Sequence, residues 1–149
     1  NYISRAIIES IKIKAFFVEK DENETLKDLN SRAMLNFGHT FGHALETMNS
    51  YSNNLTHGEA ISIGMSLAAK ISHKIGTLSN KDYQKLILHF KKTKLPTSDK
   101  RIKNNKLYKL MLSDKKNSNN RINLILLKKI GLAYFNREMK KEDIKRILK

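Results

Sequence analysis

The chain has 149 residues, the size of one domain, and 40% of them are hydrophobic, which suffices for a single core and argues against a disordered tail. It has no cysteine, which excludes disulfides, thiolate metal sites and cysteine nucleophiles. No uncharged apolar run approaches the roughly 18 residues of a membrane span, and no signal peptide opens the chain. We therefore expect a cytoplasmic protein without a membrane partner.

The net charge of +15 is distributed unevenly along the chain. Residues 1–75 carry eight basic and eight acidic side chains, so the whole excess lies in residues 76–149. This basic half is rich in Lys and Asn, with few Arg and scattered aromatic residues. A nucleic-acid module is expected to interleave Arg or aromatic residues with its lysines. We expect a Lys-rich solvated surface, and a nucleic-acid-binding helical domain is the alternative from a different class.

Hydrophobic periodicity predicts three helices in the first half. Residues 2–18 carry apolar side chains every four residues, and residues 32–49 also read as one helix. Residues 58–75 are apolar on nearly all sides, which predicts a buried helix, and Gly76 is placed to end it.

The second half predicts shorter elements. Ser79 with Asp82 has the spacing of a capping box for the next helix, which Pro96 stops, and residues 104–113 form another helix. Residues 121–130 read as a strand that Gly131 turns into 132–135, and residues 140–148 make a last helix. The predicted fold is mainly α, a multi-helical domain of about six helices with a small β-hairpin near the C-terminus.

The segment 32–59, "RAMLNFGHTFGHALETMNSYSNNLTHGE", carries the chemistry. Polar residues at spacings of four, three, four and three form one stripe on a helix, and they are Arg32, Asn36, His39, His43 and Glu46. Apolar neighbours on other faces predict that this stripe faces a cavity. Gly38 and Gly42 lie just before the two histidines and predict close approach by a ligand or another backbone, because glycine costs about 1 kcal/mol inside a helix.

Two histidines four residues apart can share a divalent metal ion. The pair is not HExxH, since position 40 is Thr, so a zincin protease is disfavoured. His57 opens the next helix and can close the site. A catalytic zinc site takes three protein ligands, so a site with two of these histidines would need a carboxylate from Glu46, from Glu59 or from outside the chain.

"RAMLNFGHTFGHALE" followed by "HGEAISIGM" resembles the signature of the 3-dehydroquinate synthase family, within the sugar-phosphate cyclase superfamily. "KAFFV" with "DENE" resembles the stretch just upstream, and "LSDKK" with "INLILLKKIG" resembles the C-terminal segment. The resemblance extends over essentially the whole chain and is strongest over residues 14–65.

The resemblance implies that residues 1–149 are the helical, metal- and substrate-binding C-terminal domain of a longer enzyme. An N-terminal domain that binds NAD, together with one glutamate ligand of the metal, would lie upstream. The start at Asn1 without a methionine and the lack of a Gly-rich phosphate loop agree with this expectation. We expect the isolated chain to be inactive and the full-length protein to be a homodimer.

The resemblance also implies a role for each matching residue. His39 and His57 match the ligands of Zn²⁺ or Co²⁺, and His43 matches a substrate-contacting proton-transfer residue. Glu24 matches an acid/base carboxylate, although counting back from Arg32 would give Asp28 that role. The expected substrate-binding residues are Lys14, Arg32, Asn36, His43 and one of Lys115 and Lys116.

The implied reaction converts 3-deoxy-D-arabino-heptulosonate 7-phosphate to 3-dehydroquinate and phosphate, a step of the shikimate pathway to aromatic amino acids. NAD would oxidise an alcohol transiently, and the metal would hold and polarise substrate oxygens. Other sugar-phosphate cyclases and metal-dependent polyol dehydrogenases share this scaffold and are the alternatives within the class.

Overall fold

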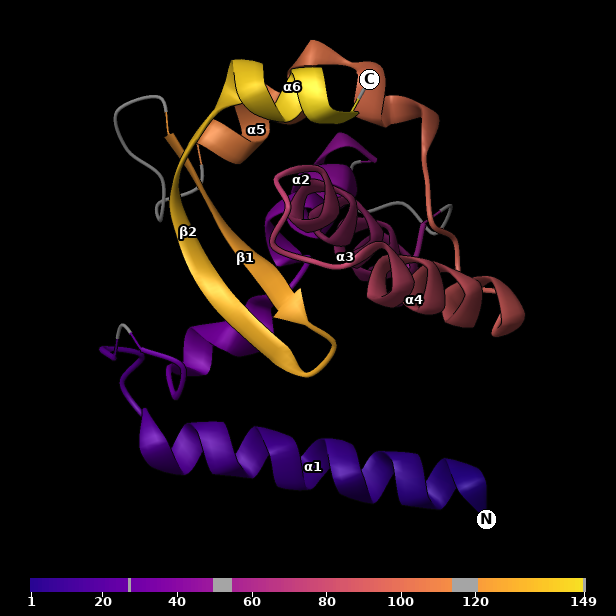
Figure 1. Cartoon of the computed structure of the whole chain (residues 1–149), viewed down its shortest axis with the longest axis vertical. Coiled ribbons are helices and arrows are strands. Elements are labelled where there is room, and N and C mark those ends of the chain that lie inside the picture. The colour runs from indigo at the N-terminus through magenta and orange to yellow at the C-terminus, as the bar shows by residue number, and fades with distance from the viewer. Residues whose placement is uncertain (27, 50–54, 114–120, 149) are drawn as a thin grey trace.

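The computed structural model describes every residue except 27, 50–54, 114–120 and 149. Its described part consists of six α-helices, two 3₁₀ helices and one β-hairpin (Figure 1). The helices are α1 (Tyr2–Lys20), η1 (Arg32–Asn36), α2 (His39–Met48), α3 (His57–Lys74), α4 (Asn80–Lys92), η2 (Lys100–Lys103), α5 (Asn105–Leu112) and α6 (Lys141–Leu148). The predicted mainly α fold with a hairpin near the C-terminus is confirmed.

Helix α3 is the centre of the core, as its apolar sequence predicts. It contacts α2, α4, α6 and strand β1 (Arg121–Lys129). Ile63 and Ile71 on α3 are almost fully buried and share one apolar cluster with Phe41 and Leu45 of α2. A capping box that was not predicted begins α3: the Thr56 hydroxyl accepts from the Glu59 backbone N–H, and the Glu59 carboxylate accepts from the Thr56 N–H. At the predicted position, the Ser79 hydroxyl caps α4 by accepting from the Asp82 backbone N–H.

The hairpin pairs β1 with β2 (Leu132–Lys140) in antiparallel register, with Leu126 opposite Tyr134. Gly131 has φ +83°, a left-handed conformation that the tight turn requires and that glycine adopts without strain. Ile122, Leu124 and Leu126 alternate along β1 and are buried in the main cluster. The second strand extends to Lys140, five residues beyond the predicted limit.

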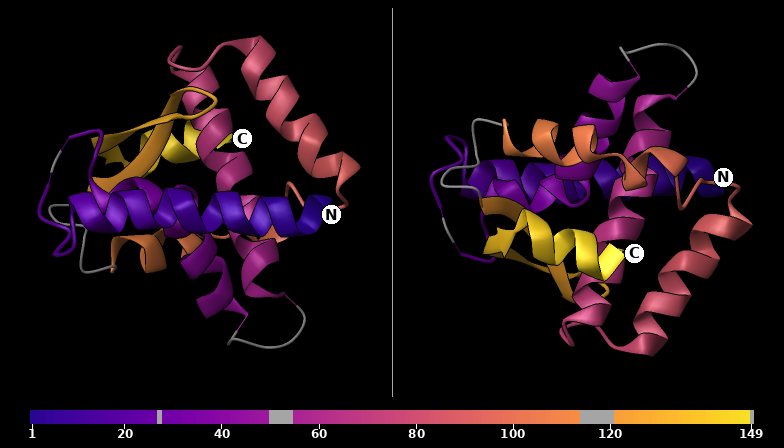
Figure 2. Two further views of the ribbon diagram at one scale, coloured as in Figure 1. Left: turned by 90° about the horizontal axis from the view of Figure 1, so that it is seen from below. Right: turned by 90° about the horizontal axis from the view of Figure 1, so that it is seen from above.

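Helix α1 stands apart from this body. In Figure 1 it lies below the other elements, and seen from below it runs across most of the width of the molecule (Figure 2). None of its residues is buried, and among the described elements its main contact is with η1. The prediction of a helix over 2–18 is correct, but its apolar residues have no core to face.

The predicted single helix over residues 32–49 is wrong. A short 3₁₀ turn covers Arg32–Asn36, Phe37 is extended, and α2 begins only at His39. The break lies at Gly38, whose φ of +85° no α-helix contains. Only His39, His43 and Glu46 of the predicted stripe share a helix, and Arg32 and Asn36 belong to a separate turn.

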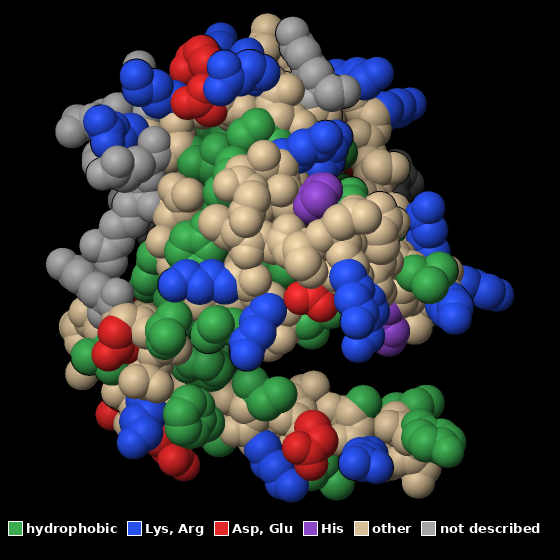
Figure 3. Space-filling model, in the orientation of Figure 1, with side chains coloured by type: hydrophobic (Ala, Val, Ile, Leu, Met, Phe, Trp, Pro, Cys, Tyr) green, Lys and Arg blue, Asp and Glu red, His purple; other side chains and the backbone are tan. Residues whose placement is uncertain are grey.

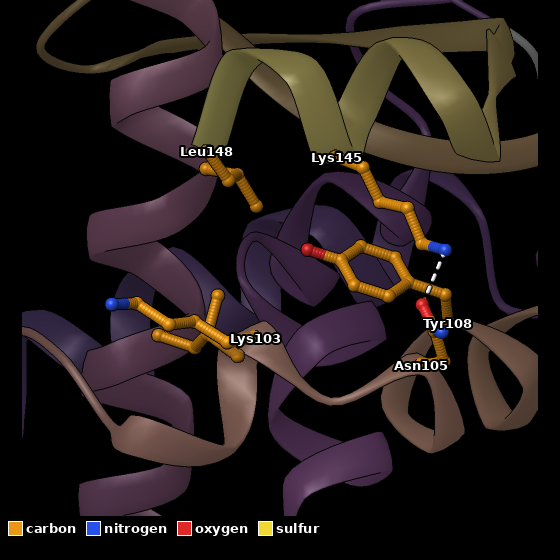
Figure 4. A pocket seen from close by; sticks show the side chains of 6 residues that line it. Lys103, Asn105, Tyr108, Lys145 and Leu148 are labelled. Carbon is orange, nitrogen blue, oxygen red and sulfur yellow. Dashed lines mark hydrogen bonds between the residues drawn. The ribbon is translucent and has the colours of Figure 1, made fainter.

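At the end of the molecule opposite to α1, residues of α5 and α6 line a hollow (Figure 4). Contacts between these residues attach α6 to the rest of the fold. The Lys145 ammonium of α6 donates to the side chain of Asn105 and lies 5.2 Å from the centre of the Tyr108 ring. These contacts hold the last helix against α5 and involve none of the predicted site residues. No helix of the described part is long and apolar enough to cross a membrane.

Candidate metal and substrate site

Three imidazole rings meet where α2 and α3 begin. The ring centres of His39 and His43 are 5.3 Å apart, and that of His57 lies 6.0 Å from His39 and 6.3 Å from His43. His39 and His43 share a face because they are one helical turn apart. His57 is the first residue of α3, so the two helix starts bring it to the same place.

Glycines allow the two helices to approach this closely. A side chain on Gly64 of α3 would place its Cβ 2.0 Å from the backbone oxygen of Gly38, and one on Gly38 would meet the backbone of Met65 at 2.5 Å. Side chains on Gly42 would likewise collide with Ile61. The expectation of close approach at Gly38 and Gly42 is confirmed, and the approaching partner is the backbone and side chains of α3.

His57 is oriented by Glu46. Its Nδ1 lies 2.9 Å from the Glu46 Oε1, and the histidine side chain is 62% exposed whereas Glu46 is largely covered. When Nδ1 carries the proton and donates to the carboxylate, Nε2 keeps its lone pair. A carboxylate bonded to the far nitrogen is the usual support of a metal-bound histidine.

His39 is half-buried, and its Nδ1 lies 3.4 Å from the carbonyl oxygen of Phe37. Burial lowers the pKa of the His39 imidazole below its ordinary 6.5, and the neighbouring His43 and His57 lower it further. The Phe37 carbonyl and Glu46 act in the opposite direction without reversing the shift. A neutral imidazole at physiological pH is the form that binds metals.

The two candidate carboxylates have different positions. Glu46 lies at the histidines, whereas Glu59 accepts from the Thr56 N–H at 2.9 Å and from its hydroxyl at 2.8 Å, which lowers the pKa of Glu59. Among the residues that the structure describes, no group of three or more His, Asp or Glu side chains is arranged to hold a metal ion. A metal ion bound by these histidines would therefore need a ligand beyond those that the described residues bring together.

His43 is exposed and lines a hollow of about 230 Å³ between α2 and the end of α5. The stripe was expected to face a cavity; His43 does border this hollow, but His43 and His57 are both exposed to solvent. Ser113 borders the same hollow and is the last described residue before Lys115 and Lys116, which lie outside the described residues.

A second group of predicted site residues surrounds the junction between α1 and η1. The Asn36 amide donates to the Glu24 carboxylate at 3.3 Å, and Glu24 itself has a left-handed φ of 54°. The Arg32 guanidinium donates to the carbonyl oxygen of Glu22 at 3.0 Å. Asp28, the alternative to Glu24, accepts from the backbone N–H of Asn30 within its own turn.

Asp21 organises this junction, and the sequence reasoning did not identify it. It is only 4% exposed, and its carboxylate accepts from the backbone N–H groups of Thr25, Leu26 and Arg32 at 2.7–3.1 Å. Burial raises the pKa of the Asp21 carboxyl, but these donors outweigh it and hold the pKa below its ordinary 3.8. The only feature of the sequence that pointed to this role is that Asp21 comes just after a predicted helix.

Lys14 remains apart from both groups. It lies on α1, where a shallow hollow is lined by Lys14 and by apolar and small residues of the same helix. The structure thus brings together three histidines with Glu46, and separately Glu24 with Asn36 beside Arg32, but it does not join Lys14 to either group.

Two solved synthase structures share this fold. It superposes with a TM-score of 0.69 on 2-epi-5-epi-valiolone synthase from Streptomyces hygroscopicus, which contains NAD⁺ and Zn²⁺, at 22% identity over 85% of this chain and 33% of that one. A 2-deoxy-scyllo-inosose synthase complexed with carbaglucose-6-phosphate, NAD⁺ and Co²⁺ gives 0.65 at 24% identity, over 78% of this chain and 33% of that one. The chain therefore shares the fold of these two synthases.

Comparison of the sequence with known families identifies the family of this chain. A family model described as "3-dehydroquinate synthase C-terminal" matches residues 1–117. The 3-dehydroquinate synthase of Thermodesulfovibrio yellowstonii is 41% identical over 95% of this chain and 38% of its own length, and that of Campylobacter concisus is 36% identical over 95% and 40%. The chain belongs to the 3-dehydroquinate synthase family, and it spans about two fifths of these relatives.

Proposed function

We propose that this chain is the metal- and substrate-binding part of a 3-dehydroquinate synthase, the lyase that converts 3-deoxy-D-arabino-heptulosonate 7-phosphate to 3-dehydroquinate and phosphate. The observation that carries the proposal is the cluster of His39, His43 and His57, with Glu46 bonded to the last of them. Family membership supports the choice of reaction over those of other cyclases, whose solved structures are only 22–25% identical.

His39 and His57 would hold the metal ion, Zn²⁺ or Co²⁺, each with its Nδ1 turned toward an oxygen and its Nε2 left for coordination. The lowered pKa of His39 keeps this ligand neutral. When bound, the ion would polarise the substrate's hydroxyl and carbonyl oxygens. The further ligand that the site needs would come from the preceding part of the protein.

His43 would move protons. It stands beside both proposed ligands but is exposed, so a substrate oxygen at the metal is within its reach. Glu24 would be the second acid/base group, and its contact with Asn36 supports Glu24 over Asp28, which is engaged in its own turn.

The substrate's phosphate and carboxylate call for cations. Arg32 and Lys14 are proposed for these groups, with Lys115 or Lys116 from the segment after Ser113, and Asn36 would add a neutral donor. The guanidinium of Arg32 is already oriented by its bond to the Glu22 carbonyl.

NAD would be bound by the N-terminal domain and would supply reversible hydride transfer. That domain and a second full-length subunit are the proposed partners, and a cytoplasmic location remains a prediction. The nucleic-acid alternative is not favoured, because the chain belongs to an enzyme family and its Lys and Arg side chains are spread over the face seen in Figure 3.

The test is phosphate release from the heptulosonate phosphate by the protein carrying both domains, with NAD and Zn²⁺ present. We expect His39→Ala and His57→Ala to lower turnover by about a hundredfold or more, whereas His89→Ala, on exposed α4, leaves it unchanged. Full activity of both variants would disprove the site.

The isolated 149-residue chain should release no phosphate and should bind zinc more weakly than the two-domain protein. Turnover by this chain alone would refute the requirement for the preceding domain. A purified two-domain protein that binds zinc at these histidines but prefers another sugar phosphate would overturn the choice of substrate.

A further inference from the structure

The apolar residues of α1 are exposed along almost the whole helix. Ile3, Ile7 and Ile11 are 69%, 54% and 61% exposed, and Ile8 and Phe16 elsewhere on the helix are about half exposed. Hydrophobic side chains can be seen along α1 in Figure 3, across a gap from the main body. A helix with so wide an apolar surface normally faces a core.

The two sides of α1 differ in chemistry. Ile3, Ile7 and Ile11 recur every four residues, and with the small residues Ala6 and Ser10 and with Lys14 they line a hollow of about 430 Å³. Small side chains between isoleucines leave room for a neighbouring element. We call this the docking face.

The opposite side of α1 is polar. Arg5, Glu9 and Lys12 recur at spacings of four and three, and Lys12 pairs with Glu9 at 3.1 Å. Apart from Phe16, which continues the same stripe, this side is charged and suited to solvent.

The relatives indicate what would cover the docking face. The matching family model is by its description a C-terminal one, and the 3-dehydroquinate synthase of Campylobacter curvus matches 99% of this chain with only 41% of its own length. The greater part of such a relative therefore precedes the matched stretch. In such a relative, the part that precedes the matched stretch adjoins the segment corresponding to α1, which makes it the nearest candidate to cover the docking face.

We propose that the docking face of α1 binds the preceding polypeptide of the same protein, and that this contact encloses Lys14 at the boundary of the two parts. The proposal rests on the proposed function, which requires such a preceding part. The surface of the preceding polypeptide that fits the docking face is apolar. It presents a hydrogen-bond acceptor, or a bound anion, opposite the Lys14 ammonium.

A second copy of this chain fits the docking face less well. Two docking faces packed together would bury two Lys14 side chains, and the acidic residues of α1, Glu9 and Glu19, lie on its other side. An ammonium group buried without a partner is costly. The occupant is therefore of different chemistry from α1 itself.

Thiol labelling tests the proposal, since this chain has no cysteine of its own. Ile7→Cys on the docking face is compared with Arg5→Cys on the polar side, each in the 149-residue chain and in the protein that includes its preceding polypeptide, with labelled sites read by peptide mass. We expect labelling at position 7 to be at least about tenfold slower in the longer protein, with position 5 unchanged.

Equal labelling rates at position 7 in the two proteins would overturn the proposal. So would protection at position 7 in the short chain that grows with concentration and accompanies a dimer in sedimentation, because the occupant would then be a second copy. Hydrogen exchange of the α1 amides in both unmodified proteins gives the same comparison without a substitution.

Labelling does not depend on turnover, so the two proposals can fail separately. Protection at position 7 in a longer protein that releases no phosphate would uphold docking and reject the proposed function. Phosphate release with position 7 fully reactive would uphold the function and reject docking.

Discussion

The Nδ1 of His57 lies 2.9 Å from the Oε1 of Glu46, across the contact between α3 and α2. The bond fixes the ring of an otherwise exposed histidine and leaves its other nitrogen available. It also joins two residues that are eleven positions apart and belong to different helices.

Replacing this carboxylate should weaken metal binding without removing a proposed ligand. We expect Glu46→Ala to lower zinc affinity by about 10–100-fold, measured by competition with a chromophoric chelator. Glu59→Gln is the matched control: it removes one negative charge from the neighbouring helix start but keeps an N3 side chain that can complete the capping box. Equal losses in the two variants would show that net charge, and not orientation of His57, sets the affinity.

The close contact of α2 with α3 should not tolerate a methyl group at Gly64. Its Cβ would lie 2.0 Å from the Gly38 carbonyl oxygen, a backbone atom that cannot rotate away as a flexible side chain would. We expect Gly64→Ala to lower the free energy of unfolding by about 3 kcal/mol, measured by urea denaturation.

Gly58→Ala provides the control on the same helix, since a Cβ there meets no atom within 4 Å. Its stability should be unchanged or higher by up to about 1 kcal/mol. A stable Gly64→Ala protein would contradict the backbone contact.

The Asp21 carboxylate should contribute stability that depends on pH. Its pKa in the folded chain is below 3.8, so the unfolded chain takes up its proton first as the pH falls. The contribution is complete above the ordinary pKa and is lost as the pH falls through the lower folded value, below about pH 4.

We expect Asp21→Asn to be less stable than the natural chain at pH 7, with a difference that shrinks below about pH 4. Thermal unfolding between pH 2 and pH 7 measures this difference. Glu9→Gln, which changes an exposed carboxylate of α1, should leave the melting temperature nearly unchanged. A stability difference for Asp21→Asn that is independent of pH would disprove the linkage.

His39 should titrate at a lower pH than an ordinary histidine. Burial lowers its pKa below 6.5, so the imidazole remains neutral at pH values where half of an unperturbed population is charged. Nitrogen-15 spectra of the metal-free chain should show a His39 midpoint below that of the same residue in urea, and saturating zinc should abolish the titration. A midpoint at or above 6.5 would contradict the burial of this ring.

The sequence by itself determined most of the helices and the chemistry of the site. Repeating apolar residues predicted α1 and α3, and Ser79 with Asp82 marked a helix start that the structure confirms. The spacing of His39 and His43 was sufficient to place both on one face, because a helical turn is a local property.

Only the tertiary structure decided how the predicted site residues are grouped. Gly38 ends the continuous stripe because its left-handed backbone lies against Met65, a contact between residues distant in sequence. The same packing brings His57 to Glu46 and assigns Glu59 to the cap. A periodic pattern specifies which residues share a face, but it carries no information on which backbone will lie against that face, and here that contact determines where the helix starts and which carboxylate meets the histidines.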